Sequence, residues 1–362
     1  MSSEDSIDLG SHFIVGLSGT QLTDEERRLL GSVRPSGVIF FKHNIDQNAE
    51  DWYVKLQRLG QEAREATGRS KFFLSVDHEG GRVHRLRQPI THFPAAHRWG
   101  EHSADVARAM ARELRGLGMN LFYGPALDTL LDPDNTVIGA RALSSDPSEV
   151  ERLGIPFIQA IEKEGLVACA KHFPGHGGTH ADSHFELPTI DADKLTLLSR
   201  EILPFRRAIE SGIRMIMTAH ILLPALDPAL PATVSRAIVT DLLRGELGFS
   251  GVVTTDALEM RALQHLSAEQ KAVLTLQGGT DLFLLAQPYG GTPLEQAERM
   301  VREIGKALSD ERLSITENDA SRARIAKLLS ETQNYDGATA QELVGLCGGH
   351  SPLCESLEKS VA

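Results

Sequence analysis

The stretch Lys171–Pro188 reads KHFPGHGGTHADSHFELP. It holds four histidines, one lysine, one aspartate and one glutamate, set among three glycines and two prolines. Glycine allows tight or left-handed backbone and proline stiffens it, so the stretch is typical of a long polar loop. The run before it, residues 166–170 (LVACA), is short and apolar, which predicts a buried strand. Because α/β proteins place active sites at the carboxyl ends of strands, the loop predicts a site in an α/β fold.

The strongest chemical signal in this loop is the pair Asp182 and His184, two positions apart. In an extended segment such residues point to the same side, and a carboxylate beside an imidazole fixes its tautomer and raises its basicity. The pair is therefore a candidate general acid/base. Lys171 and His172, at the strand end, would offer hydrogen-bond donors to an oxygen-rich ligand. A zinc site on the loop histidines is the alternative interpretation.

Eight apolar runs along the chain predict strands, and helical patterns separate them. The runs are residues 12–17, 37–41, 72–76, 120–126, 166–170, 215–218, 251–255 and 281–285. Such alternation indicates one parallel (β/α)8 barrel of the TIM type, with a doubly wound open sheet as the alternative. We expect a flexible N-terminus over residues 1–11, the barrel over 12–330 and a loosely packed C-terminal tail over 331–362. Residues 191–211 and 235–248 are each expected to form one helix.

Three other strand ends carry polar residues. Residues 77–85 (DHEGGRVHR) follow the third run, and this charged turn is either a site or a solvated loop. His220 follows the sixth run, where a structural histidine bonded to a neighbouring loop is at least as good an interpretation as a pocket residue. Asp256 follows the seventh run, and a lone aspartate there is more often a helix N-cap than a nucleophile.

The pattern KHFPGHG, four residues, DSH, three residues and proline resembles the signature of glycoside hydrolase family 3. More narrowly, it is similar to the single-domain bacterial β-N-acetylhexosaminidases of that family. By this resemblance Asp182 and His184 are the acid/base dyad, and Lys171 and His172 bind the sugar. Gly178 stands where relatives commonly carry aspartate, which bears on how the loop is braced.

Residues 77–85 resemble the family's D-Q-E-G-G-R-V-x-R segment, with His78 in place of the commoner glutamine. The resemblance implies that Asp77 and Arg85 contact the substrate. Carboxylate and guanidinium groups suit such a polar ligand. Glu79 and Arg82 are candidates for bracing the loop.

Two later segments resemble the same family. Residues 138–141 (IGAR) are similar to its I-G-x-R segment, which implies that Arg141 binds substrate. Residues 254–260 (TTDALEM) are similar to its nucleophile motif, which implies that Asp256 is the nucleophile. Many relatives carry a second aspartate where Ala257 stands.

The resemblance implies a retaining exo-β-N-acetylglucosaminidase, that is, a β-N-acetylhexosaminidase that removes terminal β-linked N-acetylglucosamine. Asp256 would form a covalent glycosyl-enzyme, and His184 would protonate the leaving group. The implied substrate is a peptidoglycan fragment handled in cell-wall recycling. A phosphorylase acting on β-N-acetylglucosaminides and a β-glucosidase of the same family are the alternatives. A carbohydrate-binding protein without catalysis would need neither Asp256 nor His184 and is disfavoured.

Composition bounds the partners and the location. The 362 residues are 41% hydrophobic and 24% charged, with a net charge of −12. Without a basic cluster nucleic acid is not an expected partner, and no apolar run is long enough to span a bilayer. We expect a monomer or weak oligomer that needs no cofactor and no metal. The N-terminus lacks the apolar core of a signal peptide and the three cysteines are too few for a disulfide framework, so the expected location is cytoplasmic.

The expected tail contains a second cluster of reactive residues, Cys347, His350 and Cys354. Cysteine and histidine together suggest a metal or redox site. Their spacing matches no common zinc pattern, however, so a tail without such a site is the favoured interpretation.

Overall fold

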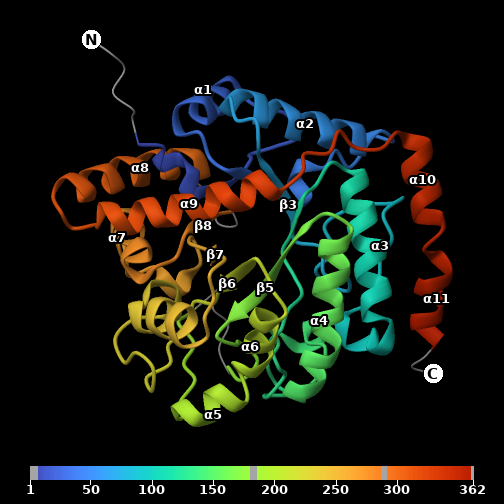
Figure 1. Cartoon of the computed structure of the whole chain (residues 1–362). Coiled ribbons are helices and arrows are strands. Elements are labelled where there is room, and N and C mark those ends of the chain that lie inside the picture. The colour runs from blue at the N-terminus through green and yellow to red at the C-terminus, as the bar shows by residue number, and fades with distance from the viewer. Residues whose placement is uncertain (1–6, 180–185, 287–291, 360–362) are drawn as a thin grey trace.

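The computed structural model describes residues 7–179, 186–286 and 292–359. Within these residues, eight parallel strands form a closed barrel in which each strand pairs with the next and β8 pairs with β1 (Figure 1). The strands are β1 (Phe13–Gly16), β2 (Gly37–Phe40), β3 (Phe73–Val76), β4 (Leu121–Phe122), β5 (Val167–Phe173), β6 (Met215–Thr218), β7 (Val252–Ala257) and β8 (Leu282–Leu285). The (β/α)8 barrel is therefore confirmed, and the pairing of β1 with β8 rules out an open sheet.

Helices surround the barrel on all sides (Figure 1). The α-helices are α1 (Asp24–Val33), α2 (Trp52–Thr67), α3 (Ser103–Gly116), α4 (Pro147–Lys163), α5 (Lys194–Ser199), α6 (Leu203–Glu210), α7 (Ala268–Gly278), α8 (Pro293–Ser309), α9 (Ile315–Glu331), α10 (Ala340–Gly348) and α11 (Ser351–Lys359). Short 3₁₀ helices are η1 (Leu9–His12), η2 (Lys42–Asn44), η3 (Ala96–Arg98), η4 (Gly100–His102), η5 (Gly139–Arg141), η6 (Ala232–Val234) and η8 (Arg261–Leu263). In the described part of the chain, no helix is both long and apolar enough to cross a membrane.

The barrel is filled by apolar side chains and closed at one end by α9. Alternate strand residues such as Ile14 and Val252 face the interior, where Leu328 of α9 joins their cluster. The same helix bonds the residues that immediately precede two strands. Asn318 Oδ1 lies 3.0 Å from His12 Nε2, and Ser321 donates to Asp281 at 2.8 Å. Helix α9 therefore covers the amino-terminal end, and the site must open at the carboxyl-terminal end.

Two helical segments differ from the sequence-based expectation. Residues 191–211 form two helices, α5 and α6, rather than one, because Arg200 leaves the helical conformation with φ −126° and ψ −76°. Residues 235–248 contain a π-helix, η7 (Ala237–Glu246), with wider turns than an α-helix. Hydrophobic periodicity does not distinguish these cases from a regular helix, because the buried face is kept in each.

The C-terminal segment is packed more tightly than a loose tail would be. Helices α10 and α11 run beside α3 (Figure 1), and Leu343, Cys347 and Leu357 are buried. His350 Nδ1 lies 2.7 Å from Glu113 Oε1 of α3. The expected loose packing is therefore wrong, because this short amphipathic stretch buries apolar side chains. Among the described residues, no group of three histidine, cysteine or acidic side chains is arranged to hold a metal ion.

Candidate active site

Two carboxylates that follow β3 meet a lysine from β5 at the carboxyl-terminal end of the barrel. Lys171 Nζ lies 2.8 Å from Asp77 Oδ1 and 2.6 Å from Glu79 Oε1. Burial lowers the pKa of Lys171, but the two carboxylates outweigh it and raise this pKa above its ordinary value. The lysine is therefore charged at neutral pH and presents hydrogen-bond donors from a buried position.

Glu79 also forms a bidentate ion pair with Arg141, which belongs to η5 in the loop after β4. Arg141 Nε lies 2.7 Å from Glu79 Oε2, and Nη2 lies 2.8 Å from Oε1. Burial alone raises the pKa of Glu79, but Arg141 and Lys171 hold it well below its usual range. The ion pair joins the loop after β3 to the loop after β4 in a fixed geometry.

His172 is held between a carboxylate and a guanidinium. Its Nδ1 lies 2.7 Å from Oδ2 of the buried Asp128, and its Nε2 lies 3.3 Å from Arg141 Nη2. Arg141 can only donate a hydrogen bond, and ionised Asp128 can only accept one. His172 therefore carries its proton on Nδ1 and accepts from Arg141 at Nε2.

These contacts form one hydrogen-bonded series of side chains across three strand ends, which we call the chain of paired charges. The chain runs in the order Asp128, His172, Arg141, Glu79, Lys171 and Asp77. Charges alternate from Arg141 to Asp77, so each of these four ionic groups has a partner of opposite charge. The neutral imidazole links Asp128 to Arg141. The paired groups leave a rigid array of donors and acceptors at the mouth of the barrel, which suits a ligand rich in hydroxyl groups.

Asp256 is the second-last residue of β7 and lies at the same end of the barrel. Its Oδ1 accepts a hydrogen bond of 2.7 Å from the backbone N–H of Ala257, and its side chain is partly exposed. Burial raises the pKa of the Tyr123 hydroxyl well above its ordinary value, and the carboxylates of Asp77 and Asp256 raise it further. Asp77 and Asp256 therefore both lie within electrostatic range of the same buried phenol. Asp256 belongs to a strand end, not to a helix N-cap.

His220 has the structural role given as one of its two interpretations. It is fully buried, with Nδ1 2.7 Å from Thr233 Oγ1 and Nε2 3.0 Å from the backbone oxygen of Ala257. Because Ala257 follows Asp256, these bonds fix the backbone beside the candidate nucleophile.

The acid/base candidates Asp182 and His184 lie outside the described residues. The loop that leads to them is described up to Thr179. There His176 is buried, its Nδ1 lies 2.9 Å from Thr179 Oγ1, and burial lowers the pKa of His176 to about 4. The start of the loop is thus anchored in the protein interior by neutral, hydrogen-bonded groups.

Arg85 and Arg82 both lie outside the chain of paired charges, and their surroundings differ. Arg85 Nε is buried and, among the described residues, no hydrogen bond to it is formed. Its proposed substrate contact remains a prediction. Arg82 is exposed and donates to the backbone oxygen of Val137 in the loop after β4, which agrees with a role in bracing the two loops.

From the sequence, no role was assigned to Asp128, which follows the fourth predicted strand. Its partner His172 is distant in sequence, and the contact arises because the chain beyond β4 continues alongside β5. The backbone N–H of Leu127 donates to the oxygen of Lys171 at 2.7 Å. Its place in the sequence could have identified Asp128, since an acidic residue at a strand end in a barrel is a site candidate.

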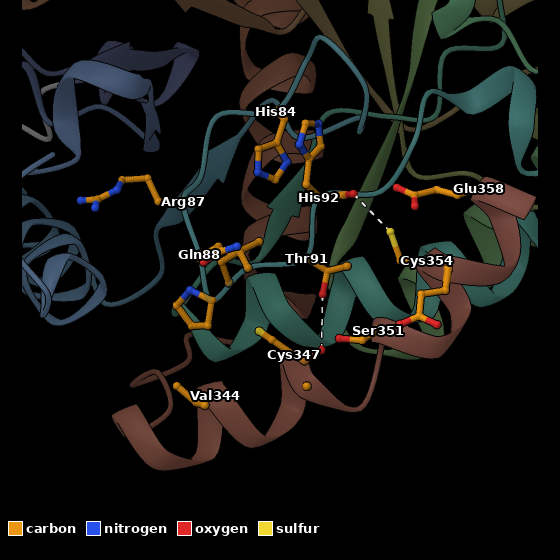
Figure 2. Close-up of a pocket in the computed structure, with 14 residues that line it drawn as sticks. His84, Arg87, Gln88, Thr91, His92, Val344, Cys347, Ser351, Cys354 and Glu358 are labelled. Atoms are coloured by element: carbon orange, nitrogen blue, oxygen red, sulfur yellow. Dashed lines mark hydrogen bonds between the residues drawn. The ribbon is translucent and has the colours of Figure 1, made fainter.

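A separate cavity of about 980 Å³ lies between residues 84–92 and helices α10 and α11. Figure 2 shows His84 and His92 on one wall, with Cys347 and Cys354 on the helices opposite. The rings of His84 and His92 stack with centroids 4.1 Å apart. None of the residues in the chain of paired charges lines this cavity, and neither does Asp256. The large cavity is therefore distinct from the candidate active site.

Comparison with known proteins agrees with this fold. The profile of the glycosyl hydrolase family 3 N-terminal domain matches residues 9–328. The chain is 34% identical to β-hexosaminidase A of Pseudoalteromonas piscicida, with 89% of this chain and 57% of that protein aligned. It is 32% identical to a β-hexosaminidase of Idiomarina loihiensis, over 85% of this chain and 97% of the relative. The chain thus spans little more than half of the first relative and nearly all of the second.

Among solved structures, the chain is similar to a family 3 β-N-acetylglucosaminidase from Paenibacillus sp.. The TM-score is 0.84 at 31% identity, with 96% of this chain and 68% of the other covered. A barrel with paired charges at its carboxyl-terminal end, matched over most of its length by this family, defines a glycoside hydrolase. The chain belongs to glycoside hydrolase family 3, and within that family to the β-N-acetylhexosaminidase group.

Proposed function

We propose that the protein is a retaining exo-β-N-acetylglucosaminidase, which removes terminal β-linked N-acetylglucosamine through a covalent glycosyl-aspartate. The observation that carries the proposal is the buried chain from Asp128 to Asp77 at the same barrel end as Asp256. The side chains from Asp128 to Asp77 supply fixed donors and acceptors for sugar hydroxyls. Asp256 supplies a carboxylate at the same end of the barrel. The similar structure from Paenibacillus sp. is that of a β-N-acetylglucosaminidase, which supports the N-acetyl sugar.

The mechanism assigns one role to each group. Asp256 attacks the anomeric carbon, forming a carbon–oxygen bond while the bond to the leaving oxygen breaks. His184, oriented by Asp182, gives a proton to the leaving oxygen and later takes one from water. Water then cleaves the glycosyl-aspartate and releases the sugar with its original anomeric configuration. The use of histidine in place of a second carboxylate requires a ring that titrates near neutral pH, which a neighbouring aspartate favours.

The natural substrate and the location form a finer part of the proposal. We propose a peptidoglycan fragment as the substrate, on the strength of the sequence resemblance, and the cytoplasm as the compartment. The three cysteines are all unpaired thiols, which is typical of a reducing compartment. Cell fractionation and assays on muropeptides test these two points.

The first experiment compares nitrophenyl β-N-acetylglucosaminide with nitrophenyl β-glucoside, each with and without phosphate. We expect strong preference for the N-acetyl sugar and no acceleration by phosphate. Acceleration by phosphate, with a sugar 1-phosphate as product, would instead identify a phosphorylase. Preference for the glucoside would contradict the proposed specificity and leave the family assignment intact. Proton NMR of the first product, with the β-anomer expected, tests retention.

A further inference from the structure

Asp128 accepts its hydrogen bonds from one neighbouring segment, residues 172–176. Its Oδ2 lies 2.7 Å from His172 Nδ1, and both of its oxygens lie 3.2 Å from the backbone nitrogen of His172. Its Oδ1 also lies 2.6 Å from the backbone nitrogen of His176. The residue has no exposed surface. It is therefore a buried acceptor that joins His172, its neighbour in the chain of paired charges, to the start of the loop at His176.

We propose that Asp128 is a positioning residue for the reaction, which fixes the tautomer of His172 and anchors the start of the loop at His176. The proposal rests on the proposed function for the identity of the sugar. Its structural part, the tautomer and the anchor, follows from the contacts alone.

The charge state of Asp128 supports this role. Burial raises the pKa of Asp128, but His172, first among its partners, and His176 hold the pKa below its ordinary value. The carboxylate is therefore ionised and only accepts hydrogen bonds. His172 must then donate from Nδ1, and its Nε2 lone pair faces Arg141, 3.3 Å away. A reversed tautomer would place two donors against each other at Nε2 and leave a lone pair against the carboxylate at Nδ1.

The same carboxylate connects two functions of the site. One oxygen bonds the imidazole that resembles the family's sugar-binding histidine, and the other bonds the backbone at His176. Loss of the carboxylate would release both contacts together. Sugar binding and the placement of the loop start are therefore coupled through one buried side chain.

Asp128→Asn is the discriminating substitution, because it keeps the size and removes the charge. An asparagine has one acceptor oxygen and one donor nitrogen where the aspartate has two acceptors. If the amide oxygen accepts from the two backbone N–H groups, the amide nitrogen faces His172 Nδ1 and favours the reversed tautomer. The hydrogen bond from Arg141 to Nε2 is then lost.

The experiment measures tautomer, kinetics and stability on the full chain. The tautomer of His172 is read by ¹⁵N NMR of histidine-labelled protein, with the signal assigned by its absence in His172→Gln. In Asp128→Asn we expect the Nδ1–H form of His172 to be lost. We expect KM for nitrophenyl β-N-acetylglucosaminide to rise about 10- to 100-fold, by analogy with carboxylates that orient a metal-bound histidine. We expect kcat to change less than KM.

The matched control is Glu201→Gln. Glu201 is another carboxylate with 1% exposure near the same loop, but it pairs with Arg200. We expect this variant to lose thermal stability and keep the wild-type tautomer of His172. An unchanged tautomer and unchanged KM in Asp128→Asn would overturn the proposal. A fall in stability alone, equal in the two variants, would reduce Asp128 to a structural residue.

The readouts also separate this proposal from the proposed function. If the wild-type protein fails to cleave the N-acetylglucosaminide, the proposed function fails, while the tautomer of His172 still tests Asp128. If cleavage is normal and the tautomer does not change, only the role of Asp128 fails.

Discussion

Arg141 and Glu79 form a bidentate ion pair with distances of 2.7 and 2.8 Å, in which Arg141 is 12% and Glu79 7% exposed. The pair joins the loops after β3 and β4 and lies in the middle of the chain of paired charges. The guanidinium thus has a structural partner in addition to any contact with substrate. Its position is set before a ligand arrives, so the ligand meets a preorganised site.

Glu79→Gln should destabilise the protein and raise KM. The change removes one negative charge and leaves Arg141 and Lys171 buried with too little compensation. Breaking a buried pair in this way typically costs about 3–5 kcal/mol of unfolding free energy. Urea unfolding measures the loss, and Glu149→Gln, which removes an exposed partner of Arg152, is the control with little expected effect. If the two variants are equally stable, other groups compensate the charges of Arg141 and Lys171 when Glu79 is lost.

Asp256→Ala should lower kcat by several orders of magnitude and leave the unfolding temperature close to that of the wild type. The side chain is partly exposed, and its loss opens no cavity in the core. Mass spectrometry with a slow fluorinated substrate should detect a glycosyl adduct on the wild type but not on the variant. Retained turnover in the variant would remove Asp256 from the role of nucleophile.

His184→Ala should affect substrates according to their leaving groups. An acid catalyst typically contributes about 10²- to 10⁴-fold, and this contribution vanishes when the leaving group needs no proton. We expect a large loss of kcat/KM with an alkyl N-acetylglucosaminide and a small one with the dinitrophenyl glycoside. Equal losses for both substrates would contradict the assignment of His184 as the acid.

Gly178→Asp should destabilise the start of the loop. A Cβ atom at Gly178 would lie 3.4 Å from Glu201 Oε1, so the new carboxylate would face a buried one. Two like charges about 4 Å apart repel by about 4 kcal/mol at an effective dielectric constant of 20, which is an upper limit here. Gly178→Asn adds the same volume without the charge and isolates the electrostatic effect. If both variants unfold at the same temperature, the repulsion is relieved by movement of Glu201.

Acid should destabilise the protein through His84. Burial, followed by the neighbouring His92, lowers the pKa of His84 to about 4 in the folded state, against an ordinary value of 6.5. The unfolded chain therefore binds more protons than the folded protein between these values. The free energy of unfolding is thus highest above pH 6.5 and decreases as the pH falls toward 4. His84→Gln should shift acid unfolding, followed by circular dichroism, to lower pH. His102→Gln, at an exposed site, is the control and should leave the midpoint unchanged.

The strands were predictable because each is a compact apolar run, and the barrel was predictable because the runs alternate with helices. Its closure is a pairing between residues near opposite ends of the chain, Ile14 with Leu284, which local patterns do not specify. The broken helix at Arg200 escaped prediction for a related reason. Periodicity reports which face is buried, and that face continues through the break.

The candidate site was predictable where a residue follows a strand and carries charge, as Asp77, Lys171 and Asp256 do. Asp128 meets the same criterion but received no role, because the role depends on a partner brought close by tertiary structure. The C-terminal helices were missed because their apolar residues are few. Leu343 is buried where α10 packs against α3, and Leu357 joins the same apolar cluster.

Helix α9 leaves the barrel with one usable opening, since Leu328 and its neighbours fill the amino-terminal end. Substrate, leaving group and released sugar must then share that opening. On the proposed retaining mechanism, the leaving group departs first and the sugar departs last. Free monosaccharide therefore competes directly with the next substrate, and a polymer cannot thread through the barrel. If the proposed exo-activity holds, we expect the enzyme to shorten its substrate by one unit per encounter and to be slowed by its accumulated product.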